Sequence, residues 1–213
     1  VRERMKKEVA AGSMPGWSNL VHASGGFANV RLANGHSKKY ERFHGKSLAE
    51  IGAALNIDPA DAAWDIALEG LPNRSVALYF MMSEQDIETA IKQPWVSIGS
   101  DAAASVNLGE VDALGLPHPR AYGTFPGIIA EYVKRRPVLS LEDAVRKMTG
   151  WPAQRMGLTD RGLIRDGMRA DIVIFDLDTL DDGATWEKPT ALPTGIWVAS
   201  MACCPSPTWP GSV

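Results

Sequence analysis

The sequence predicts an α/β fold with a parallel sheet, and the stretch 76–99 carries this prediction. A continuous apolar run, VALYFMM, covers 76–82 and is typical of a strand that is buried on both faces. The helical pattern SEQDIETAIKQ follows it, with Ser83 as its N-cap and Pro94 at its end. A second short apolar segment, WVSIG, covers 95–99. Because a strand, a crossover helix and a strand form the unit of parallel sheets, we predict that these two strands are parallel.

Caps and apolar spacing predict the other elements. Ser47 and Glu50 form a capping box before an apolar helical pattern, and Asp58 followed by Pro59 begins another helix. Three further helices are expected over 2–11, over 125–136 and after Ser140, and a short one over 152–156. Strands are expected near Val21, Val30 and Leu32, and over 172–175.

Composition excludes several classes of function. The chain has 213 residues with 22 basic and 25 acidic side chains, so its net charge of -3 gives no electrostatic basis for binding nucleic acid. It has no apolar run of about 18 residues, so we expect no membrane span. Its two cysteines, Cys203 and Cys204, are adjacent and have no other cysteine to pair with, which favours a reduced, cytoplasmic protein.

Asp101 is the first candidate for a functional residue, since it follows the strand predicted over 95–99. Active sites of parallel α/β folds lie at the C-terminal ends of strands, where a carboxylate can bind a metal, act as a general base, or both. The alternative is that Asp101 caps a turn or the N-terminus of a helix. The histidines have no metal-binding spacing: His36 and His44 are expected at the surface, and His22 in a structural role.

A series of motifs, in order, resembles the N-acyl-D-amino-acid deacylases (D-aminoacylases) of the amidohydrolase superfamily. The resemblance covers roughly 45–197 and is specific as a series, although each motif alone is weak. The motifs are GKSLAEIG, MMSEQDI, IGSD, HPRAYGTFP, SLEDAVRKMT with PA following, DRG to ADIVIFD, and ATWEKP.

The resemblance implies the C-terminal part of a (β/α)₈ TIM-like metal-dependent hydrolase barrel plus part of a small β-sandwich. It makes 76–82 and 95–99 the last two barrel strands. The organisation we expect is a partial barrel over 1–157 and a return segment to the sandwich over 158–200. An irregular tail covers 201–213, and its composition suggests a shifted reading frame.

The resemblance also implies a chemistry: zinc-dependent cleavage of the amide bond of a small-molecule N-acyl-D-amino acid, giving a carboxylate and a free D-amino acid. Asp101 would be both a zinc ligand and the catalytic base, and Arg120 would bind the α-carboxylate of the substrate. A guanidinium suits that role because it can donate two parallel hydrogen bonds to a carboxylate. For Arg120 the alternative is a structural salt bridge. The role of His118, in the same motif, stays open.

Some residues depart from the family pattern. Ala102 replaces a common glycine, which would matter if that position needs a positive φ, and Gly127 replaces a common arginine. The family's other zinc ligands lie on earlier strands, whose sequence this chain lacks. Two alternatives therefore stay open: an amidohydrolase acting on cyclic amides, as hydantoinases and dihydroorotases do, and a catalytically incomplete remnant.

Overall fold

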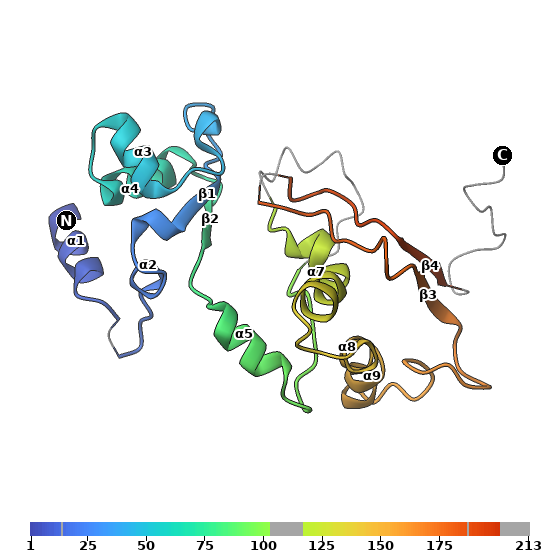
Figure 1. Ribbon diagram of the computed structural model, residues 1–213. Coiled ribbons are helices and arrows are strands. Elements are labelled where there is room, and N and C mark those ends of the chain that lie inside the picture. The colour runs from blue at the N-terminus through green and yellow to red at the C-terminus, as the bar shows by residue number, and fades with distance from the viewer. Residues whose placement is uncertain (14, 103–116, 187, 201–213) are drawn as a thin grey trace, which may run out of the picture. The chain divides into compact units, whose positions relative to one another are not determined.

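The computed structural model describes residues 1–13, 15–102, 117–186 and 188–200, and these divide into two compact units (Figure 1). Of the described residues, the first unit holds 1–87, 117–118, 186 and 188–190. The second unit holds 88–102, 119–185 and 191–200. The helix α5 (Glu84–Ile91) runs across the division.

The first unit is built from helices around a two-stranded antiparallel sheet. Its strands, β1 (Val30–Asn34) and β2 (Val76–Tyr79), pair with Val30 opposite Tyr79. The register shifts between Leu32 and Asn34. Its other elements are α1 (Arg2–Ala10), α2 (Leu20–Ala23), α3 (Leu48–Leu55), α4 (Pro59–Glu69) and the short 3₁₀ turns η1 (Phe27–Asn29) and η2 (Glu41–Phe43).

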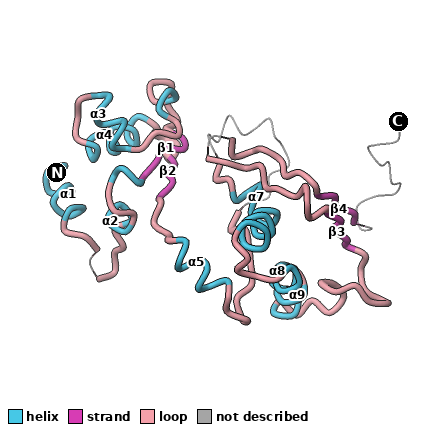
Figure 2. The backbone as a smooth tube through the Cα atoms, viewed as in Figure 1, coloured by secondary structure: helices cyan, strands magenta, loops and turns pink. Residues whose placement is uncertain are grey.

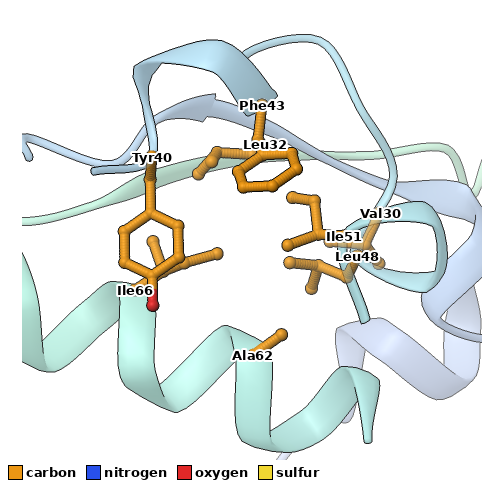
Figure 3. Packing of buried hydrophobic residues seen from close by; sticks show 8 residues of the cluster. All are labelled: Val30, Leu32, Tyr40, Phe43, Leu48, Ile51, Ala62 and Ile66. Atoms are coloured by element: carbon orange, nitrogen blue, oxygen red, sulfur yellow. The ribbon is translucent and has the colours of Figure 1, made fainter. Parts of the chain in front are cut away.

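A hydrophobic core lies in the first unit, between β1 and the helices α3 and α4 (Figure 3). Each fully buried aliphatic or aromatic side chain of such a cluster stabilises the fold by roughly 1.5–3 kcal/mol. Ile51 of α3 and Ile66 of α4 are at most 2% exposed. The cluster consists of Val30, Leu32, Tyr40, Phe43, Leu48, Ile51, Ala62 and Ile66.

The predicted caps of this unit are confirmed. The Ser47 hydroxyl accepts from the Glu50 N–H at 3.1 Å, and the Glu50 carboxylate accepts from the Ser47 N–H at 2.8 Å. The Asp58 carboxylate accepts from the Ala60 N–H at 2.7 Å, with Pro59 as the first residue of α4. Caps of this kind satisfy backbone N–H groups that have no partner inside the helix.

The second unit combines helices with a second antiparallel pair of strands. Its helices are α7 (Arg120–Ile129), the π-helical segment η3 (Ala130–Arg135), α8 (Leu141–Met148) and α9 (Gly150–Arg155). The strand predicted over 172–175 is confirmed as β3 (Asp171–Phe175). It pairs antiparallel with β4 (Ile196–Ser200), beside it in Figure 2. In the register of this pair, Asp171 lies opposite Ser200.

The predicted parallel pairing is wrong for the part of the chain that the structure describes. β2 pairs antiparallel with β1, and its ends Val76 and Tyr79 are 43% and 38% exposed, so it is not buried on both faces. Segment 95–99 forms no strand. A strand needs a neighbouring strand for its backbone groups. Here the N–H of Ile98 donates instead to the carbonyl of Lys147, at 3.0 Å.

Two smaller predictions also differ from the structure. Val21, expected in a strand, lies in α2, where the Asn19 side chain accepts from the His22 N–H at 3.0 Å and so caps the helix. The helix expected over 125–136 begins earlier, at Arg120, and continues as η3 after Ile129. Propensity located these segments, but tertiary contacts decided their type and length.

The predicted organisation into 1–157 and 158–200 stays a prediction, and so does the β-sandwich. The tail 201–213 lies outside the described residues. In the ranges that the structure describes, no helix combines the length and the apolar character that crossing a membrane requires.

Candidate functional site

The structure brings together the two residues that the sequence singled out. Asp101 follows the segment 95–99, and Arg120 is the first residue of α7. Nη1 of Arg120 lies 3.1 Å from Oδ2 of Asp101, and the two side chains are 43% and 89% exposed. Exposed pairs of this kind contribute roughly 0–1 kcal/mol, so the guanidinium can exchange this partner for another carboxylate at low cost.

The backbone at this site is unusual at Asp101 itself. Asp101 has φ 48°, in the left-handed region that aspartate tolerates better than most residues. Ala102 does not share this conformation, and its N–H donates to the Ser100 hydroxyl at 3.3 Å. The alanine at 102 therefore causes no strain of the kind that a glycine would relieve.

Gly127, the other departure from the family pattern, lies where α7 packs against Asp182. A Cβ at Gly127 would lie 2.9 Å from Oδ2 of Asp182, and a Cβ at Gly123 would lie 3.0 Å from the Cβ of Ala184. The missing side chains let the segment around Asp182 approach the helix. Burial, and next the charge of Asp181, raise the pKa of Asp182.

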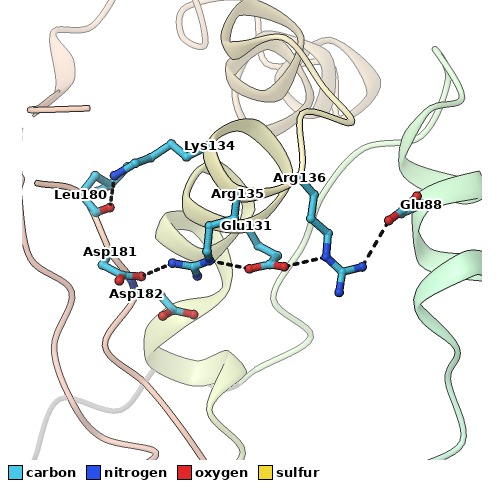
Figure 4. Close-up of polar contacts among 8 residues, drawn as sticks. All are labelled: Glu88, Glu131, Lys134, Arg135, Arg136, Leu180, Asp181 and Asp182. Atoms are coloured by element: carbon cyan, nitrogen blue, oxygen red, sulfur yellow. Dashed lines mark hydrogen bonds and ion pairs between the residues drawn. The ribbon is translucent and has the colours of Figure 1, made fainter. Parts of the chain in front are cut away.

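An ion-pair network, shown in Figure 4, holds the end of this helix. Arg135 contacts Glu131 at 2.6 Å and Asp181 at 3.2 Å, and its hydrogen bond lowers the pKa of Asp181. Arg136 links the same Glu131, at 2.8 Å, to Glu88 at 3.2 Å. In addition, the ammonium group of Lys134 donates to the carbonyl of Leu180 at 2.9 Å. These contacts join η3, which continues α7, to α5 and to the segment before β4.

His118 belongs to the first unit, where it packs on an aromatic pair. Its ring lies edge-on to Trp186 with centroids 4.8 Å apart, and Trp186 in turn lies 4.5 Å from Phe80. The guanidinium of Arg31 lies over Phe80, 5.4 Å from its centroid. The structure thus joins the HPR motif to the ATWEKP motif through ring packing.

The other histidines have local roles. His44, expected at the surface, is partly buried, and its Nε2 accepts from the Gly35 N–H at 3.3 Å. Burial is the main cause that lowers the pKa of His44. His36 is also only partly exposed and has φ 48°. His22 lines a concavity of about 540 Å³ in the first unit, together with Lys6, Phe27 and Asp58. This concavity contains neither Asp101 nor Arg120.

A zinc site does not fit the described residues. Among them, no three or more histidine, cysteine, aspartate or glutamate side chains are grouped so that they could hold a metal ion. Asp101, the predicted ligand, is paired with a guanidinium, and a positive neighbour disfavours a second cation. Protein zinc sites use three or four such ligands.

Sequence reasoning missed Lys147, which is fully buried at the end of α8. Its ammonium group donates to the carbonyls of Gln93 and Val96. The available signal was its position: Lys147 follows Ala144 by three residues and so lies on the apolar side of the helix, where lysine is uncommon.

Comparison with known proteins places these features in a family. Residues 46–198 of this chain match the sequence pattern of the family described as "Amidohydrolase family". An N-acyl-D-glutamate deacylase of Alcaligenes xylosoxydans xylosoxydans is 40% identical over 152 residues, which are 71% of this chain and 28% of that protein. An N-acyl-D-aspartate deacylase of the same organism is 36% identical over 170 residues, 76% of this chain and 30% of that protein.

A solved structure agrees with the sequence comparison. The N-acyl-D-glutamate deacylase of Bordetella bronchiseptica, crystallised with zinc and a phosphonate that mimics the tetrahedral intermediate, superposes with a TM-score of 0.70 at 31% identity. The match covers 84% of this chain and 35% of that one, so the chain spans about a third of the length of the relatives it matches. Its architecture is part of a TIM-barrel hydrolase fold. With the family match extending over most of its length, the chain belongs to the amidohydrolase family.

Proposed function

We propose that the chain is part of a hydrolase that cleaves the amide bond of N-acyl-D-amino acids to a carboxylate and a free D-amino acid. In this proposal Arg120 binds the α-carboxylate of the substrate and Asp101 is the catalytic base. The observation that carries it is the 3.1 Å ion pair between Arg120 and Asp101, because this guanidinium already holds a carboxylate. The pair supports the proposal that Arg120 binds the substrate beside Asp101. The deacylase activity of the relatives supports the choice of substrate class.

The ion pair suggests an order of events. An incoming α-carboxylate replaces Asp101 at Arg120 and accepts two hydrogen bonds from the fork of the guanidinium. Asp101, released from its cation, is then free to take a proton from the attacking water and pass it to the leaving amine. Binding of the substrate would thus switch on the base.

Zinc, which is bound to the relative of B. bronchiseptica, belongs in this proposal to the whole protein. It would polarise the amide carbonyl and activate water. Because the described residues do not fit a zinc site, the roles proposed for Asp101 and Arg120 are those that they can perform by charge and hydrogen bonding. We also propose that the protein works in the cytoplasm, as its cysteines suggest.

The test is a titration of the ¹⁵N-labelled chain with N-acetyl-D-methionine, which carries one carboxylate. Arg120→Met is expected to weaken binding about tenfold, because a charged hydrogen bond is worth roughly 1.5–3 kcal/mol. Asp101→Asn is expected to tighten it about two- to fivefold, since it removes the competing carboxylate of an exposed pair. Arg165→Met, at an exposed position of the same unit, is the matched control and should leave binding unchanged.

Equal affinities of the wild-type chain and Arg120→Met would contradict the proposal. N-acetyl-D-methioninamide, which lacks the carboxylate, and hydantoin, a cyclic amide, should each bind at least about tenfold more weakly than N-acetyl-D-methionine. Stronger binding of hydantoin than of N-acetyl-D-methionine would favour the cyclic-amide alternative. Any release of D-methionine by the wild-type chain should be lost in Asp101→Asn, and equal release from both would remove Asp101 from the role of base.

A further inference from the structure

Four consecutive backbone carbonyls, those of residues 93–96, accept hydrogen bonds from side chains of α8 and α9. Lys147 donates to the first of them, that of Gln93, and to the last, that of Val96, the latter at 3.2 Å. Between them, Arg146 donates to the carbonyl of residue 94 at 3.0 Å, and Trp151 to that of residue 95 at 2.9 Å. We call these three side chains, Arg146, Lys147 and Trp151, the carbonyl clamp.

Lys147 is the buried centre of the clamp. Its side chain is fully shielded from solvent, whereas that of Arg146 is 39% exposed. A buried ammonium group is tolerated when its N–H groups have acceptors, which here are two carbonyls and, more distantly, Asp143 with Oδ2 at 3.8 Å. The cost of burying this charge makes the geometry of the clamp strict, because a displacement of 93–96 would leave the ammonium only the distant carboxylate of Asp143.

The clamp leads directly to Asp101. Beyond Val96, the N–H of Ile98 donates to the carbonyl of Lys147 at 3.0 Å, so both the side chain and the backbone of this lysine hold the segment. Asp101 follows three residues later and contacts Arg120 in the same unit. The clamp thus replaces the neighbouring strand that residues 93–98 would have in a sheet. It provides hydrogen-bond partners for the backbone of this segment and fixes the path of the chain.

We infer that Lys147 is a positioning residue, which sets the place of Asp101 opposite Arg120 by holding residues 93–98. The functional part of this inference rests on the function proposed above. The geometric part, that the Asp101–Arg120 pair depends on Lys147, does not.

The geometric part is tested by NMR of the Arg120 side chain. In the wild-type chain, the ion pair should slow exchange of the Arg120 Nη1–H with water. Lys147→Met keeps an unbranched side chain as far as Cε but removes the ammonium donor. It should raise this exchange rate about two- to fivefold, to the rate of Asp101→Asn, because an exposed pair is worth roughly 0.2–1 kcal/mol. Lys92→Met, an exposed lysine of the same unit, is the control and should leave the rate unchanged.

The functional part is tested by a double-mutant cycle on binding of N-acetyl-D-methionine. Lys147→Met should tighten binding about twofold when Asp101 is present and should have no effect in Asp101→Asn, since coupled residues are not additive. A purely structural role of Lys147 would change affinity equally in both backgrounds, and that result would overturn the inference. The tenfold weaker binding expected of Arg120→Met distinguishes the two proposals, because it tests the proposed function alone.

A second variant, Trp151→Phe, keeps the test valid if Lys147→Met fails to fold. It keeps an aromatic ring but removes the pyrrole part of the indole, and with it the N–H that reaches the carbonyl of residue 95. Residue 95 is 63% exposed, so water can replace this donor. Its effect on the Arg120 exchange rate should have the same sign as that of Lys147→Met but be smaller. An unchanged rate in both variants, with the helical circular dichroism of the wild type retained, would overturn the inference.

Discussion

Asp181 and Asp182 are neighbours in the chain, yet the structure moves their pKa values in opposite directions. Asp181 is exposed and accepts a hydrogen bond from Arg135, which lowers its pKa. Asp182 lies against the glycines of α7, where burial raises its pKa. The sequence could not predict this, because the difference depends on which carboxylate faces a helix that begins about sixty residues earlier in the chain.

Asp182→Asn should stabilise the chain at pH 7. A carboxyl group whose pKa is raised on folding contributes stability below its unfolded pKa, and this is lost as the pH rises through the folded pKa. The amide in Asp182→Asn does not ionise, so the variant should have a larger free energy of unfolding than the wild type at pH 7. This difference should disappear toward pH 4, near the ordinary pKa of aspartate. Urea unfolding at both pH values measures this, with Asp166→Asn, at an exposed position, as control. An advantage that is equal at both pH values would contradict the assignment.

In the candidate site, too, some residues could be predicted from the sequence and others could not. Asp101 and Arg120 were predicted because each belongs to a motif, and the structure brings their side chains within 3.1 Å. Lys147 was missed because nothing in its local sequence indicates that its partners are carbonyls some fifty residues earlier. Motifs reveal residues that carry chemistry, whereas residues that position them are defined by contacts distant in sequence.

Among the elements, the helix caps followed their local signals, whereas the pairing of strands did not. The capping box of Ser47 and Glu50 lies within four residues and was predicted correctly. The pairing of β2 with β1 joins Tyr79 to Val30, and no local pattern specifies such a partner. The segment 95–99 has the apolar composition of a strand, but the carbonyl clamp, rather than a neighbouring strand, holds the residues that lead into it.

Ser47→Ala should destabilise the chain by about 1 kcal/mol, the usual cost of losing an N-cap. The Ser47 hydroxyl accepts from the Glu50 N–H, and the substitution leaves that donor without its partner at the start of α3. Chemical unfolding of the two chains measures the difference. Ser37→Ala, in a turn between β1 and η2, is the control with a smaller expected loss, and equal losses for both would contradict the role given to the cap.

At the scale of the whole molecule, both units contain buried apolar side chains and ion pairs. The first unit has the cluster of eight buried hydrophobic residues around Ile51 and Ile66. In the second unit, ion pairs around Arg135 and the bonds of Lys147 to backbone carbonyls link segments that are distant in sequence. The sequence predicted enough apolar residues for a core, but not which part of the chain would hold it.

Ile51→Ala should lower the free energy of unfolding by about 2–5 kcal/mol, the range for truncating a buried isoleucine. Ile51 is fully buried in the cluster, while Ile164 of the second unit is 92% exposed. Ile164→Ala is therefore the matched control, with an expected change within about 0.5 kcal/mol. Equal losses in the two variants, measured by urea unfolding, would contradict the location of the core.

The measurement that tests the central claim most directly is the affinity of the wild-type chain and of Asp101→Asn for N-acetyl-D-methionine. If Arg120 exchanges Asp101 for the α-carboxylate of the substrate, removing the charge of Asp101 must tighten binding, by about two- to fivefold for an exposed pair. Unchanged or weaker binding in Asp101→Asn would show that the two carboxylates do not compete for Arg120, and would contradict the account.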